Sequence, residues 1–355
     1  MNILVLMSGY PSEQQLYNCS WAHTRNKHYI NNGINVDVFV FDNEEPYIFE
    51  GVAIITKSDA VVRLNNDFYS KVISHSPNIR NHIPFLKKYC SKIPNIVFMH
   101  GSESMWINYD YPPPYKFMQD GIVKKIIRNI YDFCKFKIMK RFLSNHKNLK
   151  VVFVSEWMKS TFEKNVMSLK SANVKFEIIN NSLNEIFIER EFTKHSEKIA
   201  DVVTIRSFDL SKYAIDLVVK VAKNNPTKKF HIYGKGRYFD FHNAPNNVTV
   251  IDNFIRQDDI PNILNQYHVA LMPTRCDAQG VMVCEMATFG IPVITSDISV
   301  NREMFSTFEN VILVGNDREI ENVDIAEILM KQGGRDITRF SKSNTLDKEM
   351  KLLRS

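Results

Sequence analysis

The sequence has few cysteines and lacks the patterns that indicate a disulfide framework or a zinc site. Its five cysteines form no C-x-x-C pair and are odd in number, which favours a reducing compartment. No apolar run approaches the ~20 residues of a membrane-spanning helix. The opening MNILVLMSGYP has no basic leader and no long apolar segment, so it predicts no secretory signal. These absences predict a cytoplasmic globular protein.

Length and charge distribution indicate the number of domains and a charged surface. A chain of 355 residues suits two domains. The net charge of +6 is unevenly placed, because residues 1–182 carry +8 and the remainder carries −2. Residues 116–150 hold ten Lys or Arg against two Asp. This local excess predicts a surface with an anionic partner. No recognised binding motif accompanies the charge, so we do not expect nucleic acid to be that partner.

Short apolar runs rich in β-branched residues alternate with longer helical patterns along the whole chain. The predicted strands are 2–8, 35–41, 52–56, 71–76, 95–100, 150–155, 175–180, 201–207, 229–234, 248–253, 269–273, 292–297 and 311–315. Near-continuous apolar strands separated by helices are typical of parallel sheets covered on both faces. The pattern restarts after the polar stretch 180–200. We therefore predict an α/β protein with two doubly wound domains, whose ligands bind beyond the carboxyl ends of the strands.

The segment TRCDAQGVMVCEMATFGIPVITSD (274–297) places two carboxylates around an apolar helix. We expect that helix from about Gly280 to Phe289, with Glu285 on its apolar side. Glu285 either forms a structural ion pair with a Lys or Arg, or is fixed there to bind a ligand. Asp277 either caps the helix or serves the same ligand. Because Gly280 opens the helix, its first amides and dipole predict an anion site.

Two cations follow the first strand of the second domain. Arg206 stands at the end of that strand and Lys212 shortly afterwards. They are either two solvated surface charges or a diphosphate site beside a helix start. Gly234 in YGKG predicts a tight turn from the next strand, although a lone G-x-G is weak evidence.

The order of these segments resembles the retaining GT-B glycosyltransferases of family four, which use nucleotide sugars. Their Gly-Arg followed by Lys is similar to Ile205-Arg206 followed by Lys212, and their G-x-G strand exit is similar to IYGKG. Their two acids spaced by seven residues, followed by Gly-x-Pro-Val, resemble Asp277 to Glu285 followed by GIPVITSD. Weaker similarities are VFMHGSE (97–103), VVFVSEWMKS (151–160) and IINNSLN (178–184). The sequence departs from the family in Asp277, which replaces a Glu, and in Ile205, which replaces a Gly.

The resemblance implies roles for individual residues. Arg206 and Lys212 would bind the donor diphosphate, and Glu285 would hold the ribose hydroxyls. Asp277 would stand near the donor sugar without acting as a nucleophile, and His100 would reach that sugar from the first domain. The remaining implied donor-binding residues are Gly9, Gly234, Gln279, Gly280 and Val281. We count His100, Asp277, Arg206 and Lys212 as the catalytic residues.

The resemblance also implies the chemistry. Preorganised cations and helix amides would stabilise the charge that develops on the leaving diphosphate. The donor would be a UDP- or GDP-sugar. No two aspartates lie two residues apart, so the Asp-x-Asp metal site of other glycosyltransferases is missing. We accordingly expect no metal and no cofactor.

A basic helix is predicted within residues 121–150, with apolar positions 123, 126, 127, 130 and 134 at helical spacing. It is a surface helix on anionic lipid, with Tyr131, Phe133, Phe136 and Phe142 at the headgroups, or an internal helix whose apolar stripe packs on the first sheet, and the two interpretations are compatible. The residues of the predicted membrane or acceptor patch are Lys124, Lys125, Arg128, Lys135, Lys140 and Arg141.

Together these features predict a cytoplasmic GT-B enzyme at the inner face of the membrane. It would extend a glycan acceptor, lipid-linked, in bacterial surface polysaccharide biosynthesis of the O-antigen or capsule type. The predicted domains are two Rossmann-like units, residues 1–182 for the acceptor and 183–335 for the nucleotide sugar, with a helix at 336–355 that returns to the first. A nucleotide-sugar epimerase on the same scaffold and a non-catalytic partner subunit are the alternatives.

Overall fold

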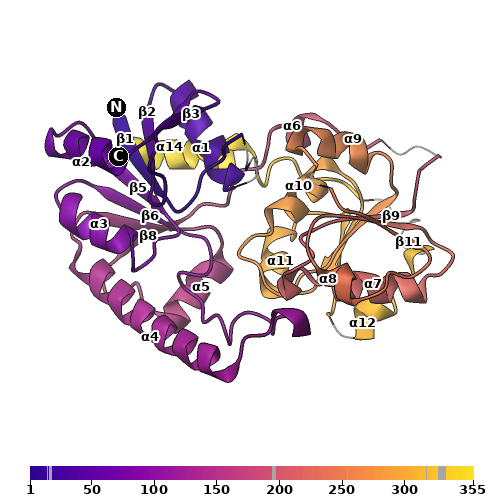
Figure 1. Ribbon diagram of the computed structural model, residues 1–355. Coiled ribbons are helices and arrows are strands. Elements are labelled where there is room, and N and C mark those ends of the chain that lie inside the picture. The colour runs from indigo at the N-terminus through magenta and orange to yellow at the C-terminus, as the bar shows by residue number, and fades with distance from the viewer. Residues whose placement is uncertain (14, 16–17, 194–196, 254, 317, 327–332) are drawn as a thin grey trace. The chain divides into compact units, whose positions relative to one another are not determined.

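The computed structural model describes residues 1–13, 15, 18–193, 197–253, 255–316, 318–326 and 333–355. The chain forms two compact units (Figure 1). Unit 1 comprises residues 1–107, 126–182 and 342–355, and unit 2 comprises residues 108–125 and 183–341. The boundaries predicted from the sequence lie after residues 182 and 335, and the structure divides the chain after residues 107, 125, 182 and 341. Segment 108–125, which the sequence analysis gave to the first domain, packs with unit 2 instead.

Unit 1 is built on an eight-stranded sheet in the order β3-β4-β2-β1-β5-β6-β7-β8. Its strands are β1 (Asn2–Met7), β2 (Asn35–Val40), β3 (Tyr47–Phe49), β4 (Val52–Ile55), β5 (Lys71–His75), β6 (Asn95–Met99), β7 (Leu149–Phe153) and β8 (Lys175–Ile178). All neighbouring strands are parallel except β3, which pairs antiparallel with β4. Five consecutive side chains of β1 are buried, because helices cover both faces of a parallel sheet.

The helices of unit 1 follow the expected crossover pattern. They are α1 (Ser20–Asn31), α2 (Lys57–Asn65), α3 (His82–Tyr89), α4 (Ile122–Asn145), α5 (Glu156–Asn165) and α14 (Leu346–Arg354), with α4 beginning in the segment that packs on unit 2. Helices α1 and α14 lie side by side (Figure 1). Tyr29 of α1 and Met350 and Leu353 of α14 share one hydrophobic cluster with β1. Helix α14 near the C-terminus therefore completes the hydrophobic core formed by β1 and α1.

Unit 2 is built on a six-stranded parallel sheet in the order β11-β10-β9-β12-β13-β14. Its strands are β9 (Val202–Ile205), β10 (Phe230–Tyr233), β11 (Val248–Ile251), β12 (Val269–Met272), β13 (Val293–Ser296) and β14 (Val311–Val314). The chain runs outward from β9 to β11 and then returns to β12 on the other side of β9. This reversal is the topological switch point, where open α/β sheets bind their ligands.

The helices of unit 2 include two that border the switch point, α7 and α10. The α-helices are α6 (Ile186–Glu189), α7 (Ile215–Asn224), α8 (Tyr238–Phe241), α9 (Ile260–Leu264), α10 (Val281–Phe289), α11 (Ser299–Met304) and α12 (Arg318–Glu321). Gly280 and Gly290 flank α10 with φ of 72° and 103°, a left-handed conformation that only glycine adopts readily. These two glycines fix where α10 begins and ends, as the sequence predicted.

All thirteen predicted strands are confirmed, with ends that differ by one or two residues. The prediction missed β3, because its three residues stand in a polar stretch and pair only at the edge of the sheet. No helix in the described part of the chain is long and apolar enough to span a membrane.

A buried ion pair joins α1 to α14. Arg25 Nε donates to both carboxylate oxygens of Glu349 at 2.9 and 3.2 Å, and its Nη2 donates to Asn181 Oδ1 at 2.9 Å. The hydroxyl of Tyr29 donates to Glu349 at 2.5 Å. The exposed fractions of the Arg25 and Glu349 side chains are 0% and 1%. Removal of either charge would leave the other buried and unpaired.

We expect Glu349→Gln to lower the free energy of unfolding of unit 1 by about 3–5 kcal/mol, because it leaves the Arg25 guanidinium without a counter-charge. Urea denaturation followed by circular dichroism measures the change. Asp347→Asn is the matched control on the same helix. The Asp347 side chain is 52% exposed, and its ion pair with His28 is long, at 3.6 Å. Equal midpoints for the two variants would contradict the prediction.

Candidate functional site

The predicted ligand-binding residues of unit 2 gather at the switch point between β9 and β12. Arg206 follows β9 directly, and Pro273–Gly280 connect β12 to α10. Lys212 lies between them in the 3-10 helix η2 (Ser211–Tyr213). The structure thus brings together Arg206, Lys212 and Asp277, which are up to 71 residues apart in the sequence.

Arg206 is a buried cation with an unused donor. Its side chain is 8% exposed, and Nη2 donates to the Met272 carbonyl at 3.3 Å. Its Nε has no hydrogen-bond partner among the described residues. Burial lowers the pKa of the guanidinium, while the nearby charges of Asp277 and Tyr213 oppose that shift. A buried donor without an acceptor is costly unless a ligand supplies one.

Lys212 supplies a second positive charge to the same place. Its ammonium lies 4.7 Å from the centre of the Tyr213 ring, and the guanidinium carbon of Arg206 lies 5.1 Å from the same ring. Burial lowers the pKa of Lys212, but the charges of Tyr213 and Asp277 outweigh it, so the pKa lies above its ordinary value. Both cations therefore stay charged, and the alternative of two solvated surface charges is wrong.

Gly234 allows the loop after β10 to close onto the loop after β9. A Cβ at this position would lie 1.7 Å from the carbonyl oxygen of Arg206, and the φ of Gly234 is 153°. The amide of Arg206 also donates to the Tyr233 carbonyl at 2.9 Å. Any larger residue at 234 would push Arg206 out of place.

The start of α10 presents backbone amides beside Asp277. Gly280 is the N-cap of α10, so Asp277 does not cap this helix. Asp277 Oδ1 instead accepts from the amide of Ala278 at 2.8 Å and from that of Gln279 at 3.5 Å. The first amides of a helix have no partner within it, and those of Gly280 and Val281 lie at this end. Together with the dipole of a nine-residue helix, they favour an anion.

Glu285 is buried on α10 without a counter-charge. Its exposed fraction is 1%, and Oε1 accepts from Gln257 Nε2 at 2.6 Å and from the amide of Asn184 at 3.4 Å. No Lys or Arg among the described residues forms an ion pair with it, and Oε2 receives no hydrogen bond from them. Burial raises the pKa of Glu285 to about 7, and the two hydrogen bonds oppose this rise. The structural ion pair considered from the sequence is therefore wrong.

The residues predicted in unit 1 lie at strand ends of their own sheet. His100 follows β6, where its Nε2 is 3.1 Å from His75 Nδ1 and its ring is 4.1 Å from that of Trp21. Burial and the charge of Arg25 hold the pKa of His100 well below its usual range, so its ring is neutral. Gly9 follows β1, and the side chain of Asn18 occupies the space that a Cβ would need. Their roles toward a ligand stay predictions.

Helix α4 has an apolar face that is exposed to solvent. Its large apolar residues and their exposed fractions are Ile122 75%, Val123 66%, Ile126 53%, Ile127 60%, Ile130 60%, Phe133 53% and Ile138 37%. The exposed basic residues beside them are Lys124, Lys125, Arg128, Lys140 and Arg141. These two sets together are the α4 surface. Because the predicted stripe faces outward, the alternative that it packs on the first sheet is wrong.

One lysine of the predicted patch and two of the aromatic residues predicted at the headgroups face inward instead. Lys135 is 5% exposed, pairs with Asp132 at 2.8 Å and donates to the carbonyls of Ser102 and Met105 at 2.7 and 2.9 Å. Phe136 and Phe142 are 5% and 1% exposed. The prediction was wrong for these three residues, because they lie on the side of α4 that packs on unit 1.

The side chains that hold the predicted residues were not predicted from the sequence. Gln257 fixes Glu285, and the loop residues Thr274 and Arg275 bind the backbone of Lys212. Gln257 stands outside every motif and gave no signal. Arg275 stands in the loop that follows the buried strand β12, two residues before Asp277, which is a signal that could have been used.

A family model described as Glycosyl transferases group 1 matches residues 202–331. No curated protein sequence matches the chain.

Several solved structures resemble the whole chain. The sucrose-phosphate synthase of Thermosynechococcus elongatus is 12% identical, with a TM-score of 0.70 over 99% of this chain and 98% of that one. Anabaena HepE (Alr3699), solved with UDP and glucose, is 12% identical, with a TM-score of 0.68 over 99% of each chain. WaaG, a glycosyltransferase involved in lipopolysaccharide biosynthesis, is 11% identical, with a TM-score of 0.63 over 93% of this chain and 90% of that one. These likenesses show that the fold is the GT-B fold predicted from the sequence.

The pKa of Glu285 makes the stability of unit 2 depend on pH. A rise from 4.5 to about 7 on folding corresponds to about 3 kcal/mol. Below about pH 4.5 the carboxyl is protonated in both states, so burial costs little. As the pH rises through 7 the folded state must ionise the buried group, and that stability is lost. Between pH 4.5 and pH 8, we expect the free energy of unfolding of Glu285→Gln to rise by up to about 3 kcal/mol relative to that of the parent.

Urea denaturation at both pH values measures this difference. The exposed Glu189→Gln in the same unit is the control, since its carboxylate stays in water in both states. A Glu285→Gln effect that is equal at both pH values would contradict the assignment.

Proposed function

We propose that this chain, which matches a model of group 1 glycosyl transferases over residues 202–331 and has the GT-B fold, transfers a sugar from a UDP- or GDP-sugar to a glycan acceptor. The configuration at the anomeric carbon would be retained. The observation that carries the proposal is Arg206, a buried cation beside Lys212 at the switch point, whose Nε has no acceptor among the residues that the structure describes.

The donor diphosphate is the anion proposed for this place. Arg206 and Lys212 both flank the Tyr213 ring, and the amides at the start of α10 add partial positive charge. An oxygen of the diphosphate would satisfy Arg206 Nε. The presence of UDP in the HepE structure supports a nucleotide as the ligand.

The ribose of the donor is the proposed partner of Glu285. Two protein donors already use Oε1, and Oε2 receives none from the described residues. Two ribose hydroxyls would donate to this carboxylate and stabilise its charged form. The ligand thereby offsets part of the cost of burying an ion.

Catalysis would rest on charge that is already in place. When the bond between the sugar and the diphosphate breaks, negative charge develops on the leaving diphosphate, and groups fixed around it stabilise the transition state more than the ground state. Arg206, Lys212 and the α10 amides supply this charge without a metal ion. Asp277 is held by two amides and would orient the donor sugar with Gln279 and Val281. In unit 1 we assign Gly9 and His100 to the donor by the family resemblance alone.

The acceptor proposed is a lipid-linked glycan of a bacterial surface polysaccharide. The α4 surface combines exposed apolar side chains with basic ones, which suits anionic headgroups. WaaG, which acts in lipopolysaccharide biosynthesis, supports this class of acceptor. We therefore place the enzyme at the inner face of the cytoplasmic membrane.

We expect UDP or GDP to raise the melting temperature of the parent protein, and Arg206→Ala to bind the same nucleotide about 10- to 100-fold more weakly, since a hydrogen bond to a charged group is lost. Thermal shift identifies the base, and isothermal titration measures Kd. Arg190→Ala, whose side chain donates to Asn262 in the same unit, is the control. Binding of neither nucleotide, or equal Kd for Arg206→Ala and the parent, would refute the donor site.

For the α4 surface we expect binding to vesicles that contain phosphatidylglycerol and weak binding to pure phosphatidylcholine. Each basic residue at an anionic surface contributes about 1 kcal/mol, so Lys124→Glu with Lys125→Glu and Arg128→Glu should weaken binding by about 100-fold or more. Co-sedimentation measures the bound fraction.

The control for this experiment is Lys87→Glu with Lys88→Glu on α3, two exposed lysines of the same unit as most of α4. Equal loss in both variants would mean that net charge alone attracts the protein. Binding that survives the α4 changes would exclude the α4 surface.

A further inference from the structure

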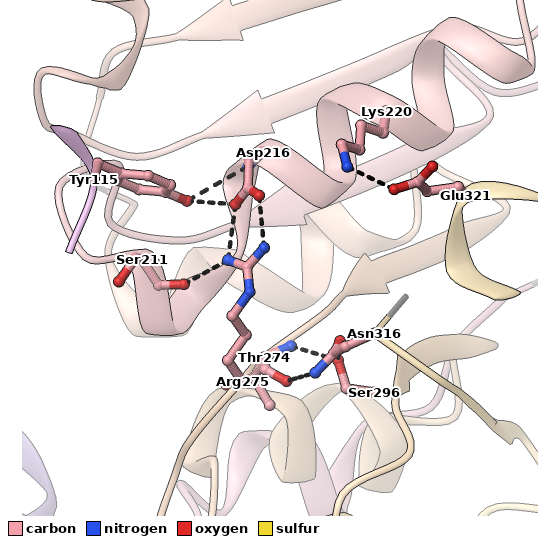
Figure 2. A network of polar contacts seen from close by, with 9 residues as sticks. All are labelled: Tyr115, Ser211, Asp216, Lys220, Thr274, Arg275, Ser296, Asn316 and Glu321. Carbon is pink, nitrogen blue, oxygen red and sulfur yellow. Dashed lines mark hydrogen bonds and ion pairs between the residues drawn. The ribbon is translucent and has the colours of Figure 1, made fainter. Parts of the chain in front are cut away.

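A bidentate ion pair stands beside the proposed donor site (Figure 2). Arg275, in the loop after β12, donates from Nη1 and Nη2 to the two carboxylate oxygens of Asp216 at 2.8 and 2.6 Å. Asp216 lies in the first turn of α7. The pair is about one-quarter exposed on each side. The parallel fork makes this pair both strong and directional.

Arg275 also binds the segment that carries Lys212. Its Nη1 donates to the Ser211 carbonyl at 2.8 Å, and its amide donates to the Lys212 carbonyl at 2.8 Å. The hydroxyl of Thr274 donates to the same Lys212 carbonyl at 3.0 Å. The loop that leads to Asp277 is therefore tied directly to the backbone of Lys212.

The other side of that loop is fixed by the ends of β13 and β14. The amide of Thr274 donates to Ser296 Oγ at 2.8 Å, and Asn316 Nδ2 donates to the Thr274 carbonyl at 2.9 Å (Figure 2). Ser296 and Asn316 also bind each other. Thr274 and Arg275 are thus held from both sides, two residues before Asp277.

Tyr115 adds a third donor to Asp216. Its hydroxyl donates to Asp216 Oδ1 at 2.8 Å, and its ring packs against Phe117 and Tyr238. Burial raises the pKa of the Asp216 carboxyl, but the bonds from Arg275 and Tyr115 outweigh it, so that pKa lies below its usual range. Segment 108–125, which runs from the loop after β6 into the first residues of α4, thus reaches the same ion pair.

We propose that the Asp216–Arg275 pair, supported by Tyr115, is a positioning device that fixes Lys212 and Asp277 relative to each other for sugar transfer. This inference rests on the proposed function of that site. Neither Arg275 nor Asp216 is proposed to touch the substrate. Their effect runs through the backbone of Ser211–Lys212 and through the loop that ends at Asp277.

The same helix carries an ion pair that should lack this role. Lys220 Nζ of α7 donates to Glu321 Oε1 of α12 at 2.5 Å, and the side chains are 51% and 34% exposed (Figure 2). No described bond joins this pair to Lys212 or to the loop after β12. It therefore serves as a matched control for the loss of an ion pair from α7.

The test uses Arg275→Lys, Asp216→Asn, Tyr115→Phe and Lys220→Gln in the full chain. Release of UDP or GDP from the corresponding sugar nucleotides is measured with and without acceptor, and thermal melting checks that each variant is folded. A lysine keeps the charge at 275 but cannot bridge two carboxylate oxygens and the Ser211 carbonyl. We expect kcat to fall about 10- to 100-fold in Arg275→Lys and Asp216→Asn.

The KM for the donor should change by less than about threefold in both variants, because the loss concerns charge that develops in the transition state. Tyr115→Phe should lower kcat by about threefold, since one of three donors to Asp216 is lost. Lys220→Gln should leave kcat unchanged. If Asp216→Asn fails to fold, Arg275→Lys and Tyr115→Phe still decide the matter.

Different outcomes overturn different claims. A folded Arg275→Lys with the parent's kcat, or an equal fall in Lys220→Gln, would overturn the positioning role alone. No release of nucleoside diphosphate by the parent, from any sugar nucleotide offered, would overturn the proposed function and this inference with it.

Discussion

The carbonyl oxygen of Lys212 is the junction on which the geometry of the strand ends in unit 2 depends. It accepts from the amide of Arg275 and from the hydroxyl of Thr274, so the exits of β9 and β12 share one acceptor. The two loops are held at a fixed distance, because both donors would lose their acceptor if the loops separated. The side chains of Arg206, Lys212 and Asp277 are consequently carried on one connected frame.

The same unit buries charge that it does not neutralise. Glu285 has hydrogen bonds but no counter-ion among the described residues, and Arg206 keeps an orphan donor. Both arrangements cost stability, and a ligand with hydroxyls near the first and phosphate oxygens near the second would relieve both. The proposed donor would therefore gain affinity from the same groups whose burial costs the protein stability. Oppositely charged groups at separate places also impose an orientation on such a ligand.

The sequence was informative wherever a local rule dominates. The parallel strands were predicted from their apolar runs. Gly280 and Gly290 indicated both ends of α10, because the left-handed backbone there favours glycine. Lys135 was assigned to the surface because a lysine is rarely buried, and only the tertiary fold brings Asp132 and two carbonyls to it. The position of segment 108–125 and the contact of Gln257 with Glu285 are long-range facts of the same kind. Motif spacing singled out Arg206, Lys212 and Glu285, whereas Gln257, which binds Glu285, belongs to no motif.

The ion pair between Arg25 and Glu349 affects the order in which the chain folds during translation. The two residues are 324 positions apart, so the ribosome has made all of unit 2 before Glu349 emerges. Until then unit 1 lacks both the counter-charge of Arg25 and the apolar face of α14 that covers part of its sheet. The nascent first unit therefore waits in an incomplete state while the second can finish, which is the reverse of ordinary N-to-C order. Such a chain exposes apolar surface for most of its synthesis, and chaperone binding should concentrate on unit 1.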